Sequence, residues 1–216
     1  MEQGHVLSAG QPRGELTPAA VRERFRGLVL TGRRYSDSVR GDHTLSGGAP
    51  PAKLTPAAVL IGLADRPEGL SVLLTQRTPH LTDHGGQISL PGGRIDPTDR
   101  DPVHAALREA QEEIGLPPDQ VEVVGRLDSY ITGTGYEITP IVGLVRVPFE
   151  NRLSPEEVAE LFEVPLRFIL DPANHRQGTR ELRGQERRFY ILPYENRYIW
   201  GATAAILVNL AEVLGA

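Results

Sequence analysis

The sequence predicts an α+β fold in which a mixed β-sheet lies between helices. Strand-like and helix-like segments follow one another without the regular strand–helix–strand order of an all-parallel sheet. The chain has 216 residues, of which 39% are hydrophobic and 24% charged, a composition typical of one globular domain with a real core. The net charge of −5 argues against general affinity for nucleic acid backbones.

The first fifty residues differ in charge from the rest of the chain. They hold seven arginines and five acidic residues, so this part carries +2 and the remainder −7. A helix is predicted over residues 16–30, with an apolar face formed by Val21, Phe25 and Leu28. Residues 41–51 are rich in glycine, serine and proline, which indicates a linker or mobile loop.

The chain is therefore predicted to consist of an N-terminal extension, residues 1–53, and a main domain, residues 54–216. The extension is interpreted as a surface arm. A dimer contact or a lid is the functional alternative.

Strands and helices of the main domain are predicted from apolar patterns and from turn residues between them. The expected strands are 57–63, 70–75, 87–90, 121–127, 138–147, 188–192 and 197–200, with a turn at Pro91-Gly92-Gly93. A long helix is expected at 102–114, short helices at 155–161 (with Ser154 as N-cap) and 166–170, and a final helix at 203–214.

The long helix carries three carboxylates on one side. Glu109, Glu112 and Glu113 stand at positions i, i+3 and i+4, which places them within roughly 100° of one another on a helix surface. Three anions so close repel, and a hard divalent cation with oxygen ligands is the best neutralising partner. The alternative is an ordinary acidic face exposed to solvent.

The same helix has clear end signals. Asp101 is a good N-cap, Pro102 suits the first helical position, and Gly115 suits the residue just past the end. An apolar stripe between these ends can pack on a core and so fix the direction of the carboxylates. Arg108 lies beside them, where it could bond an acid of the preceding loop, either Asp99 or Asp101.

These residues resemble the Nudix box. The match in its second half consists of Arg108, Glu109, Ala110, Glu112, Glu113, Gly115 and Leu116. The first half departs from the pattern: Gly93 is one residue too far from Arg108, and Arg100 stands where a glutamate is usual. We expect Asp99 or Asp101 to replace that glutamate through a one-residue insertion. The resemblance implies a Nudix-like α/β/α sandwich.

A second signature precedes the box and resembles the coenzyme A pyrophosphatase branch of the Nudix superfamily. The residues that carry it are Leu73, Leu74, Thr75, Arg77, Gly85, Pro91, Gly92 and Gly93, while Leu90 replaces a phenylalanine. Segments 135–142, 156–166 and 198–204 also have counterparts there, so the likeness runs from about Leu54 to the C-terminus.

The resemblance implies a metal-dependent enzyme. Mg²⁺ or Mn²⁺ would be held by Glu109, Glu112 and Glu113, with a carbonyl of the glycine turn, Gly92 or Gly93, as a further ligand. Glu109 is the candidate general base and, with Arg108, is predicted to be catalytic. A distal acid is the alternative base, and three residues qualify: Glu137, Glu150 and Glu157.

Substrate binding is assigned to Arg77, His84 and Gly93, each with an alternative. Arg77 could hold a phosphate or pair with a surface acid. His84, like His80, could touch substrate or be an ordinary loop residue. Trp200, the only tryptophan, is expected in the core, with stacking on adenine as the alternative.

The expected reaction is hydrolysis of a phosphoanhydride in a nucleoside diphosphate-X compound. Coenzyme A or a derivative is the preferred substrate, giving 3′,5′-ADP and phosphopantetheine. The alternatives are a Nudix pyrophosphatase for ADP-ribose, a dinucleotide or a nucleoside triphosphate, and a non-catalytic domain that senses a nucleotide.

Location and partners follow from what the sequence lacks and from the resemblance. There is no cysteine, no apolar run of membrane-spanning length and no signal-peptide pattern at the N-terminus. We expect a cytoplasmic protein with a small-molecule nucleotide substrate, no nucleic acid and no membrane partner. A homodimer is possible by resemblance.

Overall fold

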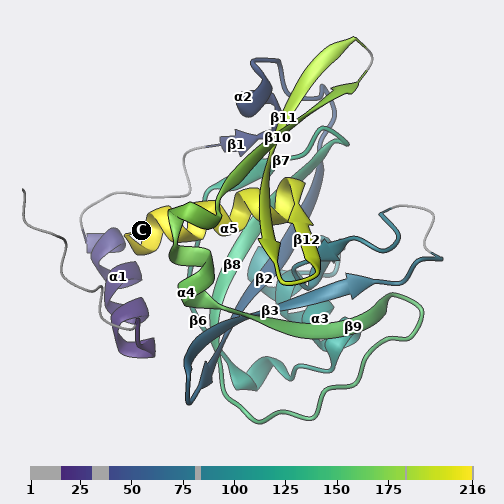
Figure 1. Cartoon of the computed structure of the whole chain (residues 1–216). Helices are drawn as coiled ribbons and strands as arrows, with labels where there is room; N and C mark the ends of the chain where they lie inside the picture. The colour runs from purple at the N-terminus through teal and green to yellow at the C-terminus, as the bar shows by residue number, and fades with distance from the viewer. Residues whose placement is uncertain (1–15, 31–38, 81–83, 183, 216) are drawn as a thin grey trace, which may run out of the picture.

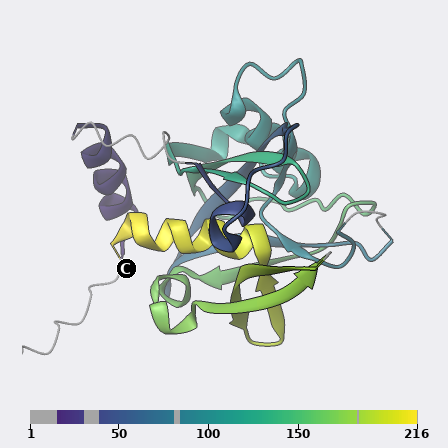
Figure 2. The same cartoon turned by 90° about the horizontal axis from the view of Figure 1, so that it is seen from above.

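The computed structural model describes residues 16–30, 39–80, 84–182 and 184–215. The described residues form a nine-stranded and a three-stranded sheet, with helices on both sides of the larger one (Figures 1 and 2). The helices are α1 (Pro18–Leu30), α2 (Asp42–Ser46), α3 (Pro102–Ile114), α4 (Leu166–Leu170) and α5 (Gly201–Leu214). The strands of the larger sheet are β1 (Val39–Gly41), β2 (Thr55–Arg66), β3 (Gly69–Arg77), β4 (Ile88–Ser89), β5 (Gly92–Arg94), β6 (Val121–Arg126), β7 (Ser129–Ile131), β8 (Tyr136–Val145) and β9 (Val158–Pro165).

The larger sheet is mixed, as the sequence predicts. Its central strand β2 runs parallel to β8, with Thr55 opposite Tyr136, and antiparallel to β3, with Leu63 opposite Val72. The strand order is β1-β7-β8-β2-β3-β4, while β5, β6 and β9 pair with β2, β8 and β3. The smaller sheet consists of β10 (Arg176–Leu182), β11 (Gln185–Tyr194) and β12 (Arg197–Trp200).

Two apolar clusters lie on opposite faces of the larger sheet. Alternate residues of β2 point to the two faces, so Ile61 joins one cluster and Leu60 the other. The first cluster contains the buried residues of α5 and α4, and the second contains the apolar side of α3. This three-layer arrangement is the predicted α/β/α sandwich.

The N-terminal region packs on the rest of the molecule. Val21 and Phe25 of α1 are buried, and the ring of Phe25 lies against Gly125 of β6. The predicted helix is confirmed, although the side chain of Leu28 lies outside the described residues. Strand β1 pairs in parallel with β7, with Val39 opposite Ser129. The division of the chain at residue 53 stays a prediction.

The segment predicted to be a linker contains an ordered element. Helix α2 begins at Asp42, whose carboxylate accepts hydrogen bonds from the Tyr130 hydroxyl and the Gly133 backbone N–H, both at 2.6 Å. The linker prediction is therefore wrong at this point. Glycine content indicates where a chain can turn, but not that one carboxylate will bond to a strand some ninety residues away.

The prediction of a helix at residues 155–161 is wrong. Ser154 does begin a single turn, since the N–H groups of Glu157 and Val158 donate to its carbonyl oxygen. The chain then becomes β9, which pairs antiparallel with β3 and buries Val158 and Val164. The local N-cap and proline signals are overridden because β3 offers a complete edge of backbone hydrogen-bonding groups.

Two further differences concern short or polar strands. The predicted turn at Gly92-Gly93 is strand β5, in which Gly92 pairs with Val59 and Gly93 with Ala58 of β2. Strand β10 was not predicted, because its sequence RQGTREL lacks the apolar alternation of a half-buried strand. The other predicted strands and the helices at 102–114, 166–170 and 203–214 are confirmed, with the last beginning two residues earlier. Within the described ranges, no helix is long and apolar enough to cross a membrane.

Candidate active site

Helix α3 is held at both ends as the sequence predicts. The Asp101 side chain accepts a hydrogen bond from the His104 N–H at 2.8 Å, and Pro102 occupies the first turn. The helix ends at Gly115, whose φ of 72° is the left-handed conformation that favours glycine. Ala106 and Ala110 are fully buried against the sheet, so packing determines which way the acidic side faces.

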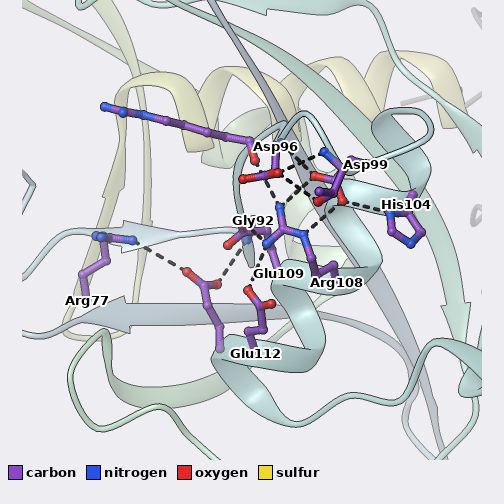
Figure 3. A network of polar contacts seen from close by, with 11 residues as sticks. Arg77, Gly92, Asp96, Asp99, His104, Arg108, Glu109 and Glu112 are labelled. Atoms are coloured by element: carbon purple, nitrogen blue, oxygen red, sulfur yellow. Dashed lines mark hydrogen bonds and ion pairs between the residues drawn. The ribbon is translucent and has the colours of Figure 1, made fainter.

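Arg108 is the centre of the polar network on this helix (Figure 3). Its guanidinium donates to both oxygens of Asp99, through Nε at 3.0 Å and Nη2 at 2.8 Å. Its Nη1 donates to Glu109 at 2.8 Å and to Glu112 at 2.9 Å. These bonds hold the pKa of the buried Asp99 carboxyl well below its usual range and raise that of Arg108. Asp99 therefore replaces the missing glutamate of the box, while Asp101 serves as the cap.

The three glutamates of α3 do not all share the same partner. Glu109 and Glu112 both bind Arg108, whereas Glu113 accepts a bond from the Gly92 N–H at 3.1 Å and lies 3.7 Å from the Arg77 guanidinium. Among the described residues, no three acidic or histidine side chains are grouped as a ready metal site. Glu109 and Glu112 are paired with Arg108, whereas the charge of Glu113 is only partly compensated, by the Gly92 N–H and by Arg77. Their assignment as metal ligands stays a prediction.

The chemistry of these carboxylates nevertheless fits a hard divalent cation. Burial raises the pKa of Glu113 to about 7, and the pKa of Glu109 is also raised, chiefly by burial. A carboxylate whose charged form is disfavoured by its surroundings gains most from a nearby cation, and oxygen is the donor atom that Mg²⁺ and Mn²⁺ prefer. Residues 109, 112 and 113 together supply such oxygens from one side of one helix.

Strand β5 brings its backbone close to the carboxylates of Glu109 and Glu113. Gly92 has a φ of 151°, and a Cβ atom there would lie 2.4 Å from the Ala58 carbonyl oxygen. A Cβ atom on Gly93 would lie 2.7 Å from each oxygen of Glu109. Only glycine permits this close approach, which explains why two glycines precede the acidic helix.

A cavity of about 740 Å³ borders these glycines. Its wall is made of β2, β4, β5, the β7–β8 loop, the three-stranded sheet and the first residues of α5. The volume lies within the usual range for small-molecule sites. Four of the predicted site residues line it: Arg77, His84, Gly92 and Gly93.

The comparisons with known proteins agree with this geometry. Residues 53–182 match the family model described as NUDIX domain. The chain is 42% identical over 157 residues to the uncharacterized Nudix hydrolase NudL of Escherichia coli K12, which covers 73% of this chain and 81% of that protein. NudL of Shigella boydii shows the same identity and coverage.

The chain belongs to the Nudix family. It is a hydrolase of pyrophosphate bonds, and enzymes of this family generally use divalent metal ions and small nucleotide substrates. Among solved structures, RenU, a Nudix hydrolase of M. smegmatis, is 29% identical over 56% of this chain and 76% of its own, with a TM-score of 0.45. A C. elegans Ap4A hydrolase is 21% identical over 51% and 80%, also with a TM-score of 0.45.

The structure decides between some of the alternatives for this Nudix hydrolase. The acid beside Arg77 is the buried Glu113 and not a surface acid, which was one of the two alternatives for this residue; phosphate binding by Arg77 stays a prediction. His84 has a φ of 60°, and its Nδ1 lies 3.0 Å from the Gln87 amide oxygen. Trp200 is only half-buried and borders the cavity, so the core prediction is wrong.

Sequence reasoning missed several residues of the Nudix cavity. Arg94 donates to the Tyr136 hydroxyl at 2.8 Å and lies 5.6 Å from the centre of its ring. Arg180, Arg187 and Phe189 come from the β10–β11 pair. The adjacent arginines at 187 and 188 were a visible signal, but only the strand register shows which residues face the cavity.

Proposed function

We propose that this Nudix hydrolase cleaves the pyrophosphate of coenzyme A or a derivative, releasing 3′,5′-ADP and phosphopantetheine. The observation that supports the proposal is the cavity that begins at Gly92, Gly93 and Arg77 and continues to a wall of arginine and aromatic side chains. Such a wall suits a ligand that carries anionic groups and a flat ring. The only acidic residue that lines the cavity is Asp42, among the described residues.

The residues of the chain suggest how the reaction proceeds. A divalent cation held by Glu109, Glu112, Glu113 and the Gly92 carbonyl, Mg²⁺ or Mn²⁺, would neutralise the phosphate oxygens and lower the pKa of a bound water. A water molecule would attack one phosphorus atom, the bond from that phosphorus to the bridging oxygen would break so that this oxygen leaves with the other phosphate, and a carboxylate would accept the proton of the water.

Glu109 is the proposed base, with Arg108 as the residue that positions it. Arg77, which lines the cavity at the strand end beside the glycines, is proposed to hold a phosphate oxygen. Of the distal acids, Glu157 is the better alternative base, because its charge acts on the pKa values of both Glu109 and Glu113.

A substrate panel tests the proposal. Coenzyme A, ADP-ribose, a dinucleotide and a nucleoside triphosphate are compared with Mg²⁺ and with Mn²⁺, and coenzyme A should give the highest kcat/KM. A higher value for another compound would remove coenzyme A as the substrate. A raised Tm with any of these compounds but no product would instead support a domain that only senses a nucleotide.

Two substitutions test the carboxylates. Glu112→Gln and Glu113→Gln should each lower kcat by at least about a hundredfold, because each removes a metal ligand and a charge from the site. Glu122→Gln is the matched control, since Glu122 pairs with Arg22 on the surface. Near-normal rates in both α3 variants, with folding checked by circular dichroism, would overturn the assignment.

The cytoplasmic location and the homodimer are part of the same proposal. They rest on the sequence and on the family resemblance. Cell fractionation tests the first, and sedimentation equilibrium tests the second.

A further inference from the structure

The wall of the cavity contributed by the small sheet carries two opposed arginines. Arg180 of β10 and Arg187 of β11 are direct cross-strand partners, and both line the cavity. Side chains at paired positions lie on the same face of a sheet, and two like charges there destabilise the pair. Both side chains border the cavity from this face, close enough together to bind one anionic group of a ligand.

The same face continues with two aromatic rings. Phe189 lies two residues after Arg187, and Trp200 is paired with Ile191, two residues further along β11. Because side chains alternate along a strand, these positions share the face of the arginine pair. The two rings meet edge to face with centroids 5.5 Å apart, and both border the cavity.

Among the described residues, most of the charged side chains that line the cavity are arginines. The cationic residues that line it are Arg77, Arg94, Arg180, Arg187 and Arg188. The carboxylate of Asp42, which also lines it, already accepts two hydrogen bonds, from Tyr130 and from Gly133. The small sheet and α3 lie on different sides of the larger sheet (Figure 2). The arginine pair is therefore distinct from the carboxylates proposed to act on the pyrophosphate.

We propose that this face is a subsite for a phosphomonoester on the nucleoside, with Arg180 and Arg187 binding the phosphate and Phe189 and Trp200 contacting the base. The inference rests on the proposed function and deepens it. A phosphomonoester carries close to two negative charges at neutral pH and so matches two arginines, whereas each phosphorus of a substituted pyrophosphate carries about one. The substrate class is thus a nucleoside diphosphate derivative that also bears a phosphate on its ribose.

Binding of two product-like probes tests the subsite without turnover. Adenosine 3′,5′-bisphosphate and AMP differ only in the ribose phosphate, and their affinities are measured by calorimetry on the full chain with a chelator present. The wild type should bind the bisphosphate at least about tenfold more tightly, the factor expected for one charge-assisted interaction. Phe189→Leu should weaken both probes, because it removes a contact with the base.

Substitution of single arginines tests which residues bind the ribose phosphate. Arg180→Gln and Arg187→Gln should each lower bisphosphate affinity about tenfold or more and change AMP affinity less than about threefold. Arg176→Gln is the matched control: it removes the same charge from an exposed position of β10 that does not line the cavity. Equal binding of the two probes by the wild type, or equal losses in the Arg176 and Arg180 variants, would overturn the subsite.

Kinetics separate this inference from the proposed function. Coenzyme A and 3′-dephospho-coenzyme A share the scissile bond, and the wild type should have the lower KM for coenzyme A, with the difference abolished in Arg180→Gln. If coenzyme A is hydrolysed but the probes bind equally, the subsite is wrong and the proposed function stands. If the probes are discriminated but coenzyme A is not hydrolysed, the subsite stands and the proposed substrate is wrong.

Discussion

The carboxylates of Asp99 and Glu113, which precede and follow Arg108 in the sequence, differ in how well their negative charge is compensated. Asp99 receives two hydrogen bonds from the Arg108 guanidinium and one contact from His104, so its charge is well compensated despite full burial. Glu113 is 2% exposed and has one backbone N–H donor and an arginine at 3.7 Å. Its burial is therefore the stronger influence, and its pKa rises to about 7.

The shift of Glu113 has a predictable effect on stability in metal-free protein. Because the pKa rises from 4.5 in the unfolded chain to about 7, the folded state holds more protons between these values, and stability falls as the pH rises through them. Glu113→Gln removes this dependence. The variant should match the wild type near pH 4, below the unfolded value, and exceed it by about 3 kcal/mol near pH 8.

Urea unfolding with a chelator at several pH values measures this difference. Glu156→Gln serves as the control, since Glu156 is exposed, and should track the wild type at every pH. Parallel pH profiles for the wild type and Glu113→Gln would contradict the prediction.

At the scale of elements, the contact between β5 and α3 brings the glycines to the carboxylates. Strand β5 pairs with β2 through Gly92 and Gly93, and α3 packs on the same sheet through its alanines. The helix was predictable because its caps, its apolar period and its acidic side all agree. Strand β9 was not predictable, since Ser154 and Pro155 are helix signals and only the edge of β3 overrides them.

Gly93→Ala tests the contact between these two elements. The added methyl group would meet the carboxylate of Glu109, which is the end of a flexible side chain and can move away. The variant should lose at least about tenfold in kcat, because the proposed base is displaced, while the free energy of unfolding changes by about 1 kcal/mol or less.

Gly27→Ala in α1 is the control for this variant. Apart from its own helix, no described residue has an atom within 4 Å of a Cβ at that position, and alanine favours a helix. The control should keep full activity. Normal kcat in Gly93→Ala would show that the position of Glu109 is not critical for the reaction.

At the scale of the whole molecule, the N-terminal region contributes to the core and to the cavity wall. Val21 and Phe25 are buried in the cluster that contains α5, and β1 extends the main sheet. Arg40 of β1 pairs with the buried Asp128 at 2.8 Å and with Glu212 of α5 at 2.7 Å. These contacts connect residues far apart in the sequence on either side of residue 53.

Truncation tests whether the main domain keeps its stability without residues 1–53. A chain that begins at residue 54 loses the burial of Val21 and Phe25, about 1.5–3 kcal/mol each, together with the β1–β7 pairing. Its Tm should fall by on the order of 10 °C. Deletion of residues 1–15 alone, which removes none of these contacts, is the control. Equal Tm values for the full and the shorter chain would show that the main domain folds independently.

The sequence by itself determined the family, the acidic helix with its ends, and the mixed sheet, because each depends on local patterns: the order of motif residues, helix caps, or apolar alternation. Asp99 as the partner of Arg108 was also within reach, since the two are nine residues apart. Only the tertiary structure decided that Arg77 faces Glu113, that Asp42 joins the cavity wall, and that Arg180 opposes Arg187. These contacts depend on strand register and on packing between distant segments, which a one-dimensional pattern does not contain.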